Sequence, residues 1–546
     1  MSDNTQLNPQ EPILQVQDLS IPLHFGGDRA YAVKDVSFEV YPGEILCIVG
    51  ESGSGKSMSS NAIMGLLPQE ITPDQGRIMF MGQDLLQCTE SQLLALRGKE
   101  MAMIFQEPMS ALNPLMTVGR QVVEVMEAHR ALTNEERVQR TIELFDFVGL
   151  PEPQRLFHTH PFRLSGGQRQ RVMIAMAMAL KPRLLIADEP TTALDVTTQA
   201  QILKLIENTQ KEINMGVIFV THDFGVVAEI ADRVAVMEQG LLVEQGKADD
   251  ILNRPQHPYT QKLIAAVPRL RREQELRGEV ETPVLEVRNL KKHYTLREGL
   301  LRPPRIIKAV DNVSFTVNRG ETLGIVGESG SGKSTIGKCL LRLIDVNGGE
   351  ILFQGQDIAQ YTQKQLRPLR QHMQMIFQDP FSSLNPRHTI GKSICDGPIA
   401  NGVPPRQAEE RARELLELVG LDASAFNRYP NQFSGGQRQR VGIARALALD
   451  PSLIIADESV SALDVSVQAQ VLDLLKNIQE QLQLGMIFIT HDLRVASQVC
   501  QRILVMHRGK VVEQGAPFDI FLEPQNDYTK SLVAAIPGKQ WELGMN

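Results

Sequence analysis

The stretch Gly50-Glu51-Ser52-Gly53-Ser54-Gly55-Lys56-Ser57 decides the fold, and it recurs unchanged as Gly327-Glu328-Ser329-Gly330-Ser331-Gly332-Lys333-Ser334. Each copy fits the pattern G-x-x-x-x-G-K-[S/T] of a phosphate-binding P-loop. Each follows an apolar run, at 44–50 or 321–327, and precedes a predicted helix. A plain glycine-rich turn is the simpler interpretation, but two identical copies in a strand–loop–helix context favour phosphate binding.

In such a loop the glycines let the backbone approach phosphates, and successive N–H groups at a helix N-terminus bind anions. We expect Lys56 and Lys333 to reach the outer phosphates, and Ser57 and Ser334 to bind Mg²⁺. The residues that follow, Met58 and Thr335, complete the two predicted nucleotide-binding segments.

Length and composition limit the classes of protein. The chain has 546 residues, 42% of them hydrophobic, and a net charge of −8, which is typical of a soluble multidomain protein and argues against nonspecific nucleic-acid binding. Its five cysteines form no C-x-x-C pair, so neither a cysteine metal cluster nor a disulfide framework is expected. The first ten residues do not resemble a signal peptide, and no apolar run is long enough to span a membrane. We expect a cytosolic protein, or one bound to the cytosolic face of a membrane.

The chain contains two copies of one duplicated domain. Lys56 and Lys333 are separated by 277 residues, and later pairs such as Asp188 and Asp457 are separated by 269. A solenoid would need more and shorter repeats. We therefore predict a first domain at 1–270, a charged linker at 271–283 that ends in proline, and a second domain at 284–546.

Each copy alternates short apolar runs with longer helical patterns. The runs at 183–188 and 216–221, and their counterparts at 452–457 and 485–490, are continuous and end in a polar residue. This pattern predicts a buried parallel sheet with its site at the carboxyl ends of the strands, an α/β fold. The region 109–180 is predicted to form a mostly helical subdomain.

Two further motifs follow each P-loop. Asp188-Glu189 and Asp457-Glu458 each end an apolar strand, where the aspartate can hold Mg²⁺ and the glutamate can orient or deprotonate a water molecule. Ser-Gly-Gly-Gln precedes a predicted helix in both copies and offers a second anion site. Its residues are Ser165, Gly166, Gly167 and Gln168, and Ser434, Gly435, Gly436 and Gln437. Two phosphate-binding surfaces per domain suggest that two domains share each nucleotide.

The order of these motifs resembles that of ATP-binding cassette (ABC) ATPases, P-loop proteins with a RecA-like core and a helical subdomain. The resemblance covers nearly the whole chain. It is strongest to the ATPase subunits of bacterial dipeptide, oligopeptide, glutathione and nickel importers, because of the segments 105–114, 377–386, 255–268 and 524–537. Fusion of two cassettes in one chain is similar to the glutathione-importer type in particular.

The resemblance implies roles for individual residues. Glu189 and Glu458 are expected to be catalytic bases, and His222 and His491 to contact the γ-phosphate. Gln106 and Gln378 are expected to sense Mg²⁺ and the γ-phosphate. The cassettes are expected to pair head to tail, so that each P-loop shares ATP with the Ser-Gly-Gly-Gln motif of the other copy.

The family also implies an aromatic side chain that stacks on adenine. Tyr294 is at the expected position in the second copy, whereas Leu23 is at that position in the first. Phe25 and Tyr31 are the alternatives there, and Phe25 is our candidate. Some relatives bind an iron–sulfur cluster through cysteines that follow a Pro-Tyr-Thr motif. No cysteine lies between this motif at 258–260 and the start of the second domain, and none follows its counterpart Asp-Tyr-Thr at 527–529, so no cluster is expected.

The expected function is that of an ATP-hydrolysing subunit, with Mg²⁺, of an importer for short peptides or glutathione at the cytoplasmic face of a bacterial inner membrane. Its partners would be two integral-membrane permeases and a periplasmic solute-binding protein, without nucleic acid. One alternative keeps this role with nickel or another small solute as cargo. The other is a soluble tandem ATPase that acts on ribosomes or DNA.

Overall fold

The computed structural model describes residues 11–23, 29–130, 132–191, 194–268, 283–296, 305–379, 383–461 and 463–542. The chain forms two compact units. The first comprises residues 1–194, 198–267 and 537–546, and the second comprises residues 195–197 and 268–536. Each unit contains one P-loop. Residues 271–282 of the expected linker lie outside the described residues.

A six-stranded sheet forms the centre of the first unit. Its order is β10-β9-β3-β8-β7-β6, and all neighbours run parallel except β10 and β9. The strands are β3 (Ile45–Val49), β6 (Met101–Ile104), β7 (Leu184–Asp188), β8 (Gly216–Thr221), β9 (Arg233–Glu238) and β10 (Leu241–Lys247). Every residue of β3, β7 and β8 is buried, which confirms the prediction from their continuous apolar runs.

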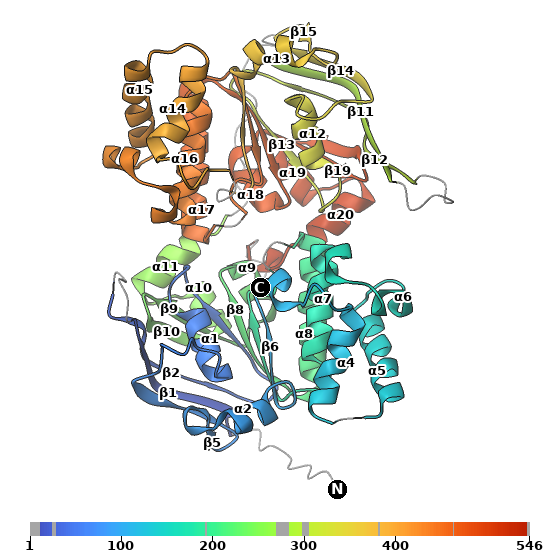
Figure 1. Ribbon diagram of the computed structural model, residues 1–546, viewed down its shortest axis with the longest axis vertical. Helices are drawn as coiled ribbons and strands as arrows, with labels where there is room; N and C mark the ends of the chain where they lie inside the picture. The colour runs from blue at the N-terminus through green and yellow to red at the C-terminus, as the bar shows by residue number, and fades with distance from the viewer. Residues whose placement is uncertain are drawn as a thin grey trace. The chain divides into compact units, whose positions relative to one another are not determined.

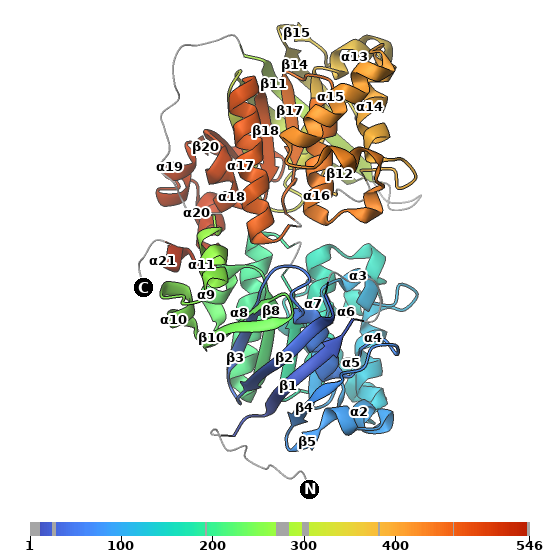
Figure 2. The same ribbon diagram turned by 90° about the vertical axis from the view of Figure 1, so that its left-hand side faces the viewer.

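A second, antiparallel sheet belongs to the same unit. Its order is β2-β1-β4-β5, from β1 (Leu14–Pro22), β2 (Tyr31–Val40), β4 (Gln75–Phe80) and β5 (Gln83–Asp84) (Figure 2). Side chains from this sheet and from β3, β7 and β8 share one hydrophobic core, which includes Phe38, Ile48 and Ile186. The P-loop is therefore joined to a strand that is packed on both faces.

The helices of the first unit fall into two groups. The first group includes the P-loop helix and the helices around the sheets: α1 (Lys56–Met64), α2 (Glu90–Leu96), α8 (Val196–Ile213), α9 (Phe224–Ile230), α10 (Ala248–Asn253), α11 (Pro258–Ala265) and the C-terminal α21 (Lys539–Glu542). The second forms the predicted helical subdomain: α3 (Pro108–Ala111), α4 (Val118–Ala128), α5 (Asn134–Phe147), α6 (Pro153–Phe157) and α7 (Gly166–Ala177). In this subdomain α4, α5 and α7 pack against one another (Figure 1).

The second unit repeats this design. Its six-stranded sheet has the order β16-β17-β18-β13-β19-β20, from β13 (Thr322–Val326), β16 (Met373–Ile376), β17 (Leu453–Asp457), β18 (Gly485–Thr490), β19 (Arg502–His507) and β20 (Lys510–Gly515). Its antiparallel sheet, β12-β11-β14-β15, consists of β11 (Leu285–Leu296), β12 (Arg305–Val317), β14 (Gly348–Phe353) and β15 (Gln356–Asp357). The helices are α12 (Lys333–Leu340), α13 (Gln363–Arg370), α14 (Ile390–Ala400), α15 (Pro405–Leu418), α16 (Gly435–Leu447), α17 (Val465–Leu482), α18 (Leu493–Val499), α19 (Pro517–Leu522) and α20 (Asp527–Ala534).

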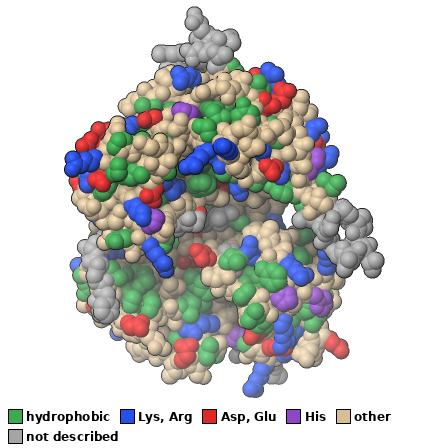
Figure 3. All heavy atoms as spheres, turned by 45° about the horizontal axis from the view of Figure 1, so that its top comes forward, with side chains coloured by type: hydrophobic (Ala, Val, Ile, Leu, Met, Phe, Trp, Pro, Cys, Tyr) green, Lys and Arg blue, Asp and Glu red, His purple; other side chains and the backbone are tan. Residues whose placement is uncertain are grey.

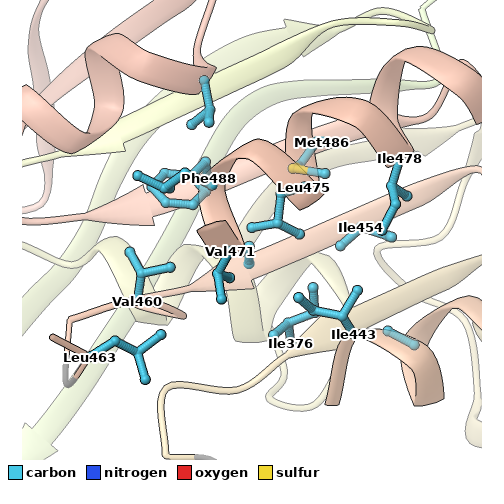
Figure 4. Packing of buried hydrophobic residues seen from close by; sticks show 14 of the residues in the cluster. Ile376, Ile443, Ile454, Val460, Leu463, Val471, Leu475, Ile478, Met486 and Phe488 are labelled. Carbon is cyan, nitrogen blue, oxygen red and sulfur yellow. The ribbon is translucent and has the colours of Figure 1, made fainter. Parts of the chain in front are cut away.

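Helix α17 shows how sequence periodicity builds this core. Val471, Leu475 and Ile478 recur at helical spacing, and all three are at most 1% exposed. Figure 4 shows them directed toward side chains of β17 and β18, including Ile454 and Phe488. This packing fixes the two strands whose ends carry Asp457 and Thr490.

The C-terminal segment packs on the first unit. The N–H of Gly538 donates a hydrogen bond to Glu229 at the end of α9, at 3.2 Å. The indole N–H of Trp541 donates to Asn253 at 3.1 Å, and this side chain, the only tryptophan of the chain, is 8% exposed. Gly538 has a φ of +71°, and a Cβ there would lie 2.7 Å from the Cα of Gly225. The two compact units are therefore not two continuous segments of the chain, because this C-terminal tail contacts α9 and α10 of the first unit.

We expect Gly538→Val to displace this tail, because the added side chain would overlap Gly225 and strain the left-handed backbone. The fluorescence of Trp541 should then shift to the longer wavelength of an exposed indole. Gly402→Val is the matched control, since Gly402 also has a positive φ (+92°) but no atom within 4 Å of the position that a Cβ would take. Unchanged emission in Gly538→Val would contradict the packing of the tail.

Candidate functional site

The two P-loops have the backbone geometry that their glycines permit. Gly55 and Gly332 immediately precede α1 and α12 with φ values of +103° and +108°. A Cβ on Gly55 would lie 2.6 Å from the carbonyl oxygen of Ala32, and one on Gly332 would lie 2.0 Å from that of Ala309. Only glycine fits a left-handed backbone this close to a carbonyl group. Both loops therefore lead directly into helix N-termini, where successive N–H groups favour an anion.

The P-loop lysines are buried over their own loops. The Nζ of Lys56 donates to the carbonyl oxygens of Gly50 and Glu51 at 2.7 and 2.9 Å. Lys333 repeats these bonds to Gly327 and Glu328 at 2.8 and 2.9 Å. Burial lowers the pKa of Lys333, although the carboxylates of Glu458 and Asp457 oppose this change. A buried ammonium group that donates to neutral carbonyls is suited to bind the charged oxygens of a phosphate.

A serine–aspartate pair lies beside each lysine. The hydroxyl of Ser57 donates to Asp188 at the end of β7, at 3.2 Å, and that of Ser334 donates to Asp457 at the end of β17, at 2.9 Å. The two aspartates are 6% and 5% exposed. Burial raises the pKa of each carboxyl, and the serine hydrogen bond only partly opposes it. The residue types and the low exposure fit a divalent cation, because oxygen ligands and a negative charge converge where water is scarce.

The neighbouring glutamates are held by a strained backbone. Glu189 and Glu458 have φ values of +46° and +44°, in the left-handed region that non-glycine residues rarely adopt. The N–H of Glu189 donates to Val220 at 3.0 Å, and that of Glu458 donates to Ile489 at 2.9 Å, so the adjacent strand fixes this conformation. The same strain at both copies indicates that the direction of the carboxylate matters.

Each glutamate lies between a glutamine and a histidine. The side chain of Gln106 donates to Glu189 at 3.0 Å, and Nδ1 of His222 lies 3.4 Å from the other carboxylate oxygen. In the second unit Gln378 donates to Glu458 at 2.6 Å, and Nδ1 of His491 lies 3.7 Å away.

The environment of Glu458 favours its charged form. Burial alone would raise the pKa of this carboxyl, but His491, Lys333 and Gln378 together lower it. An ionised carboxylate in a fixed direction is what a general base for water requires.

The Ser-Gly-Gly-Gln motifs form the N-termini of α7 and α16. The hydroxyl of Ser165 accepts the N–H of Gln168 at 3.2 Å, and the Gln168 side chain accepts the N–H of Ser165 at 3.0 Å. Ser434 and Gln437 form the same reciprocal cap at 3.3 and 3.0 Å.

The two glycines of each motif differ in surroundings. A Cβ on Gly167 would lie 3.0 Å from Thr198, and one on Gly436 would lie 2.3 Å from Val467, so these positions allow close helix packing. The space around Gly166 is open, and the nearest atom to a Cβ on Gly435 is 3.9 Å away. The first glycine of each motif thus leaves the helix N-terminus accessible to an anion.

The positions of the adenine-stacking candidates differ between the units. Tyr294 lies on β11, is 39% exposed and has the ammonium of Lys292 5.2 Å from its ring centre. Leu23 follows β1 at the matching position and packs partly buried against the core. The hydroxyl of Tyr31 donates to Asp74 at 3.1 Å. Phe25 lies outside the described residues.

The remaining P-loop candidates, Met58 and Thr335, lie near the starts of α1 and α12. Met58 packs partly buried against the core of the first unit, and Thr335 is half-buried at the start of α12.

Sequence reasoning missed one residue in each unit. The hydroxyl of Tyr259, in α11, accepts the N–H of Glu51 at 3.2 Å, and that of Tyr528, in α20, accepts the N–H of Glu328 at 3.1 Å. Both tyrosines belong to the repeated Pro-Tyr-Thr and Asp-Tyr-Thr segments. The repetition of this tyrosine was the available signal, but its contact links residues 208 and 200 positions apart.

Comparison with known proteins agrees with this geometry. The family profile described as "ABC transporter" matches residues 33–192 and 310–461, and the profile "Oligopeptide/dipeptide transporter, C-terminal region" matches residues 243–293. The chain is 48% identical over 532 residues to the peptidoglycan transport ATP-binding protein YejF of Agrobacterium fabrum, which covers 96% of both proteins. It is also 48% identical over 558 residues to the glutathione import ATP-binding protein GsiA of Escherichia coli K12, which covers 96% of this chain and 89% of that protein.

The profile matches contain both P-loops and both Asp-Glu pairs, and the relatives align over nearly the whole chain. The chain therefore belongs to the ABC transporter family, as an ATPase subunit with two ATP-binding cassettes in one polypeptide.

Proposed function

We propose that this chain is the energy-coupling ATPase of a bacterial importer for short peptides or glutathione, and that both cassettes hydrolyse ATP. The observation that carries the proposal is the arrangement around Glu189 and Glu458. In each cassette a strained glutamate lies between a glutamine and a histidine, beside a buried serine–aspartate pair. No catalytic side chain of one cassette is replaced in the other.

The geometry supports a direct mechanism of hydrolysis. The P-loop N–H groups and Lys56 or Lys333 bind the β- and γ-phosphates, which places the terminal phosphorus at the ends of β3 and β7 or of β13 and β17. Glu189 or Glu458 accepts a proton from the attacking water as its oxygen bonds to phosphorus and ADP leaves. His222 and His491 donate to the γ-phosphate, and Gln106 and Gln378 orient the glutamate and the water.

Magnesium is the proposed cofactor, and Ser57, Asp188 and Gln106, with Ser334, Asp457 and Gln378, are the residues that would hold it. When bound, Mg²⁺ supplies positive charge that neutralises the phosphate oxygens. The buried serine–aspartate pairs support the proposal, because Mg²⁺ usually takes one or two carboxylates and completes its shell with phosphate oxygens and water.

We propose that nucleotide binding pairs the cassettes head to tail, with the P-loop of each facing the Ser-Gly-Gly-Gln motif of the other. The proposal is supported by the open N-termini of α7 and α16, which provide a second anion site in each cassette. Closure upon ATP binding and opening after hydrolysis would move the helical subdomains as rigid bodies. The linker at 271–283 and the domains at 1–270 and 284–546 remain the proposed division of the chain, except that the tail from Pro537 groups with the first unit.

The proposed partners are two integral-membrane permeases and a periplasmic solute-binding protein, at the cytoplasmic face of the inner membrane. Among the helices that the structure describes, none is both long and apolar enough to cross a membrane. Nucleic acid is not among the proposed partners. The net charge is −8, and side chains of both signs are interspersed over the face that Figure 3 shows.

The cargo class is inferred from the relatives. One carries a name for peptidoglycan transport and the other for glutathione import, and the matched C-terminal region is that of oligopeptide and dipeptide transporters. All three point to cargo with peptide bonds, which favours it over nickel.

We expect Glu189→Gln and Glu458→Gln each to lower total ATP turnover at least about twofold, and the double substitution to lower it at least about a hundredfold, because general-base catalysis contributes about 10²–10⁴. Phosphate release measures this directly. Glu124→Gln, on an exposed face of α4, is the matched control. Full turnover in either single variant would show that this site does not contribute.

We expect Asp188→Asn to stabilise the metal-free protein. Burial in the folded state raises the pKa of Asp188. The contribution of Asp188 to the stability of the folded protein is therefore greatest below the pKa that this side chain has in the unfolded chain, and it is lost as pH rises through its pKa in the folded protein. Removing the charge should raise Tm at pH 7 by about 2–4 °C, the shift that about 1 kcal/mol produces in a domain of this size.

The same variant should lose the Mg²⁺-dependent stabilisation by ATP, and its advantage in Tm should shrink as pH falls and Asp188 becomes protonated. Differential scanning calorimetry at several pH values provides both readings. A lower Tm in the metal-free variant at pH 7 would contradict the assignment of Asp188 as a costly buried charge.

The transport proposal is tested by purifying the tagged chain from gently solubilised bacterial membranes and identifying every copurifying protein. We expect two multispanning permeases to copurify with the chain. When the chain carries Glu189→Gln and Glu458→Gln and ATP is present, we expect the solute-binding protein to copurify as well. Recovery with ribosomes or DNA-repair proteins, and without a membrane protein, would overturn the transport role while leaving the ATPase assignment intact.

A further inference from the structure

One peptide group in each P-loop is held from two sides. The carbonyl of Gly50 accepts the ammonium of Lys56 at 2.7 Å, and the N–H of the same peptide, on Glu51, donates to the hydroxyl of Tyr259 at 3.2 Å. In a trans peptide these two groups point in opposite directions. The tyrosine therefore fixes the plane of the peptide on which the lysine lies.

The second cassette has the same arrangement. The carbonyl of Gly327 accepts Lys333 at 2.8 Å, and the N–H of Glu328 donates to Tyr528 at 3.1 Å. The two sets of contacts form independently in two units whose sequences differ around the motif. This agreement marks the tyrosine–peptide–lysine arrangement as part of the site.

The tyrosines are themselves held firmly. Glu244, on β10, accepts the N–H groups of Gln256 and His257 at 2.7 and 3.1 Å, immediately before α11. His257 then caps the N-terminus of α11 by accepting the N–H of Tyr259 at 3.3 Å. Tyr259 is only 7% exposed, so its hydroxyl has little freedom to leave Glu51.

In the second cassette Glu513, on β20, accepts the corresponding N–H groups of Gln525 and Asn526 at 2.8 and 3.1 Å. Asn526 accepts the N–H of Tyr528 at 2.9 Å. The ring of His507 stacks on that of Tyr528 with centres 4.0 Å apart. Burial raises the pKa of Tyr528 to about 12, so its hydroxyl stays neutral at physiological pH.

We propose that Tyr259 and Tyr528 are positioning residues for ATP: each hydroxyl fixes the first peptide of its P-loop and thereby the point from which the lysine reaches the phosphates. Neither tyrosine needs to touch the nucleotide. The proposal rests on the ATPase activity of the family and is independent of the cargo. It gives the C-terminal part of each cassette, α11 or α20, a direct structural connection to phosphate binding.

The test uses Tyr→Phe, which removes only the hydroxyl and keeps the ring, including its stacking on His507. Tyr259→Phe is measured together with Glu458→Gln, so that turnover reports the first P-loop. Tyr528→Phe is measured together with Glu189→Gln for the second. We expect KM for ATP to rise about fivefold, the effect of losing one hydrogen bond, with kcat changed less than about twofold.

Affinity for a fluorescent ATP analogue should fall by the same factor, while Tm changes little. Tyr41→Phe is the matched control. The hydroxyl of Tyr41, which directly follows β2, also donates a hydrogen bond, to Glu39 on β2 at 2.6 Å, and Tyr41 belongs to neither P-loop. A general loss of stability would lower Tm and kcat together and would not produce the KM–kcat split.

Unchanged KM and unchanged affinity in both Tyr→Phe proteins would overturn the proposal. If one variant fails to fold, the other cassette provides the same test independently. A wild-type chain without ATPase activity would instead contradict the family's activity, so the two failures are distinguishable.

Discussion

The hydrogen bond between Ser57 and Asp188, repeated between Ser334 and Asp457, is the interaction on which each cassette depends. It joins the P-loop helix to the end of a buried strand 131 residues later in the first cassette and 123 residues later in the second. The carboxylates are costly where they lie, since burial raises their pKa values. A hydroxyl only partly offsets that cost, and a metal–phosphate ligand would offset it further. The sheet and its packed helices keep this polar edge in place.

The duplicated sequence gives an internal comparison of what the site requires. The side chains of the site recur in both cassettes with contacts of nearly the same length. They are lysine, serine, aspartate, glutamate, glutamine, histidine and tyrosine. The differences lie around them: Met58 corresponds to Thr335, Pro190 to Ser459, and Leu23 to Tyr294. We therefore expect the adenine base to be bound in unequal surroundings in the two cassettes, and the phosphates to be bound alike. Two equivalent catalytic sites with different adenine pockets are what this pattern predicts.

Much of the fold could be predicted from the sequence, because the P-loop and the continuous apolar strands are local patterns. The burial of the parallel strands β3, β7 and β8 and the presence of a helical subdomain follow from them. Other features depend on contacts between distant segments and leave no local pattern. The positive φ of Glu189 is imposed by Val220 on the neighbouring strand, and the contact of Tyr259 with Glu51 requires the whole first domain. The packing of Trp541 beside α10 could not be predicted from the sequence for the same reason. Phe25 lies outside the described residues and remains a prediction.

We expect one polypeptide to contain two complete ATP sites. Counting the nucleotides bound per chain tests it most directly, by native mass spectrometry of the chain carrying Glu189→Gln and Glu458→Gln with Mg²⁺ and ATP. The structure predicts two ATP molecules per chain, with the count falling to one after Lys56→Ala or Lys333→Ala and to zero after both. A single ATP in the chain with both lysines intact would contradict the equivalence of the two cassettes, and none would contradict the assignment of both P-loops.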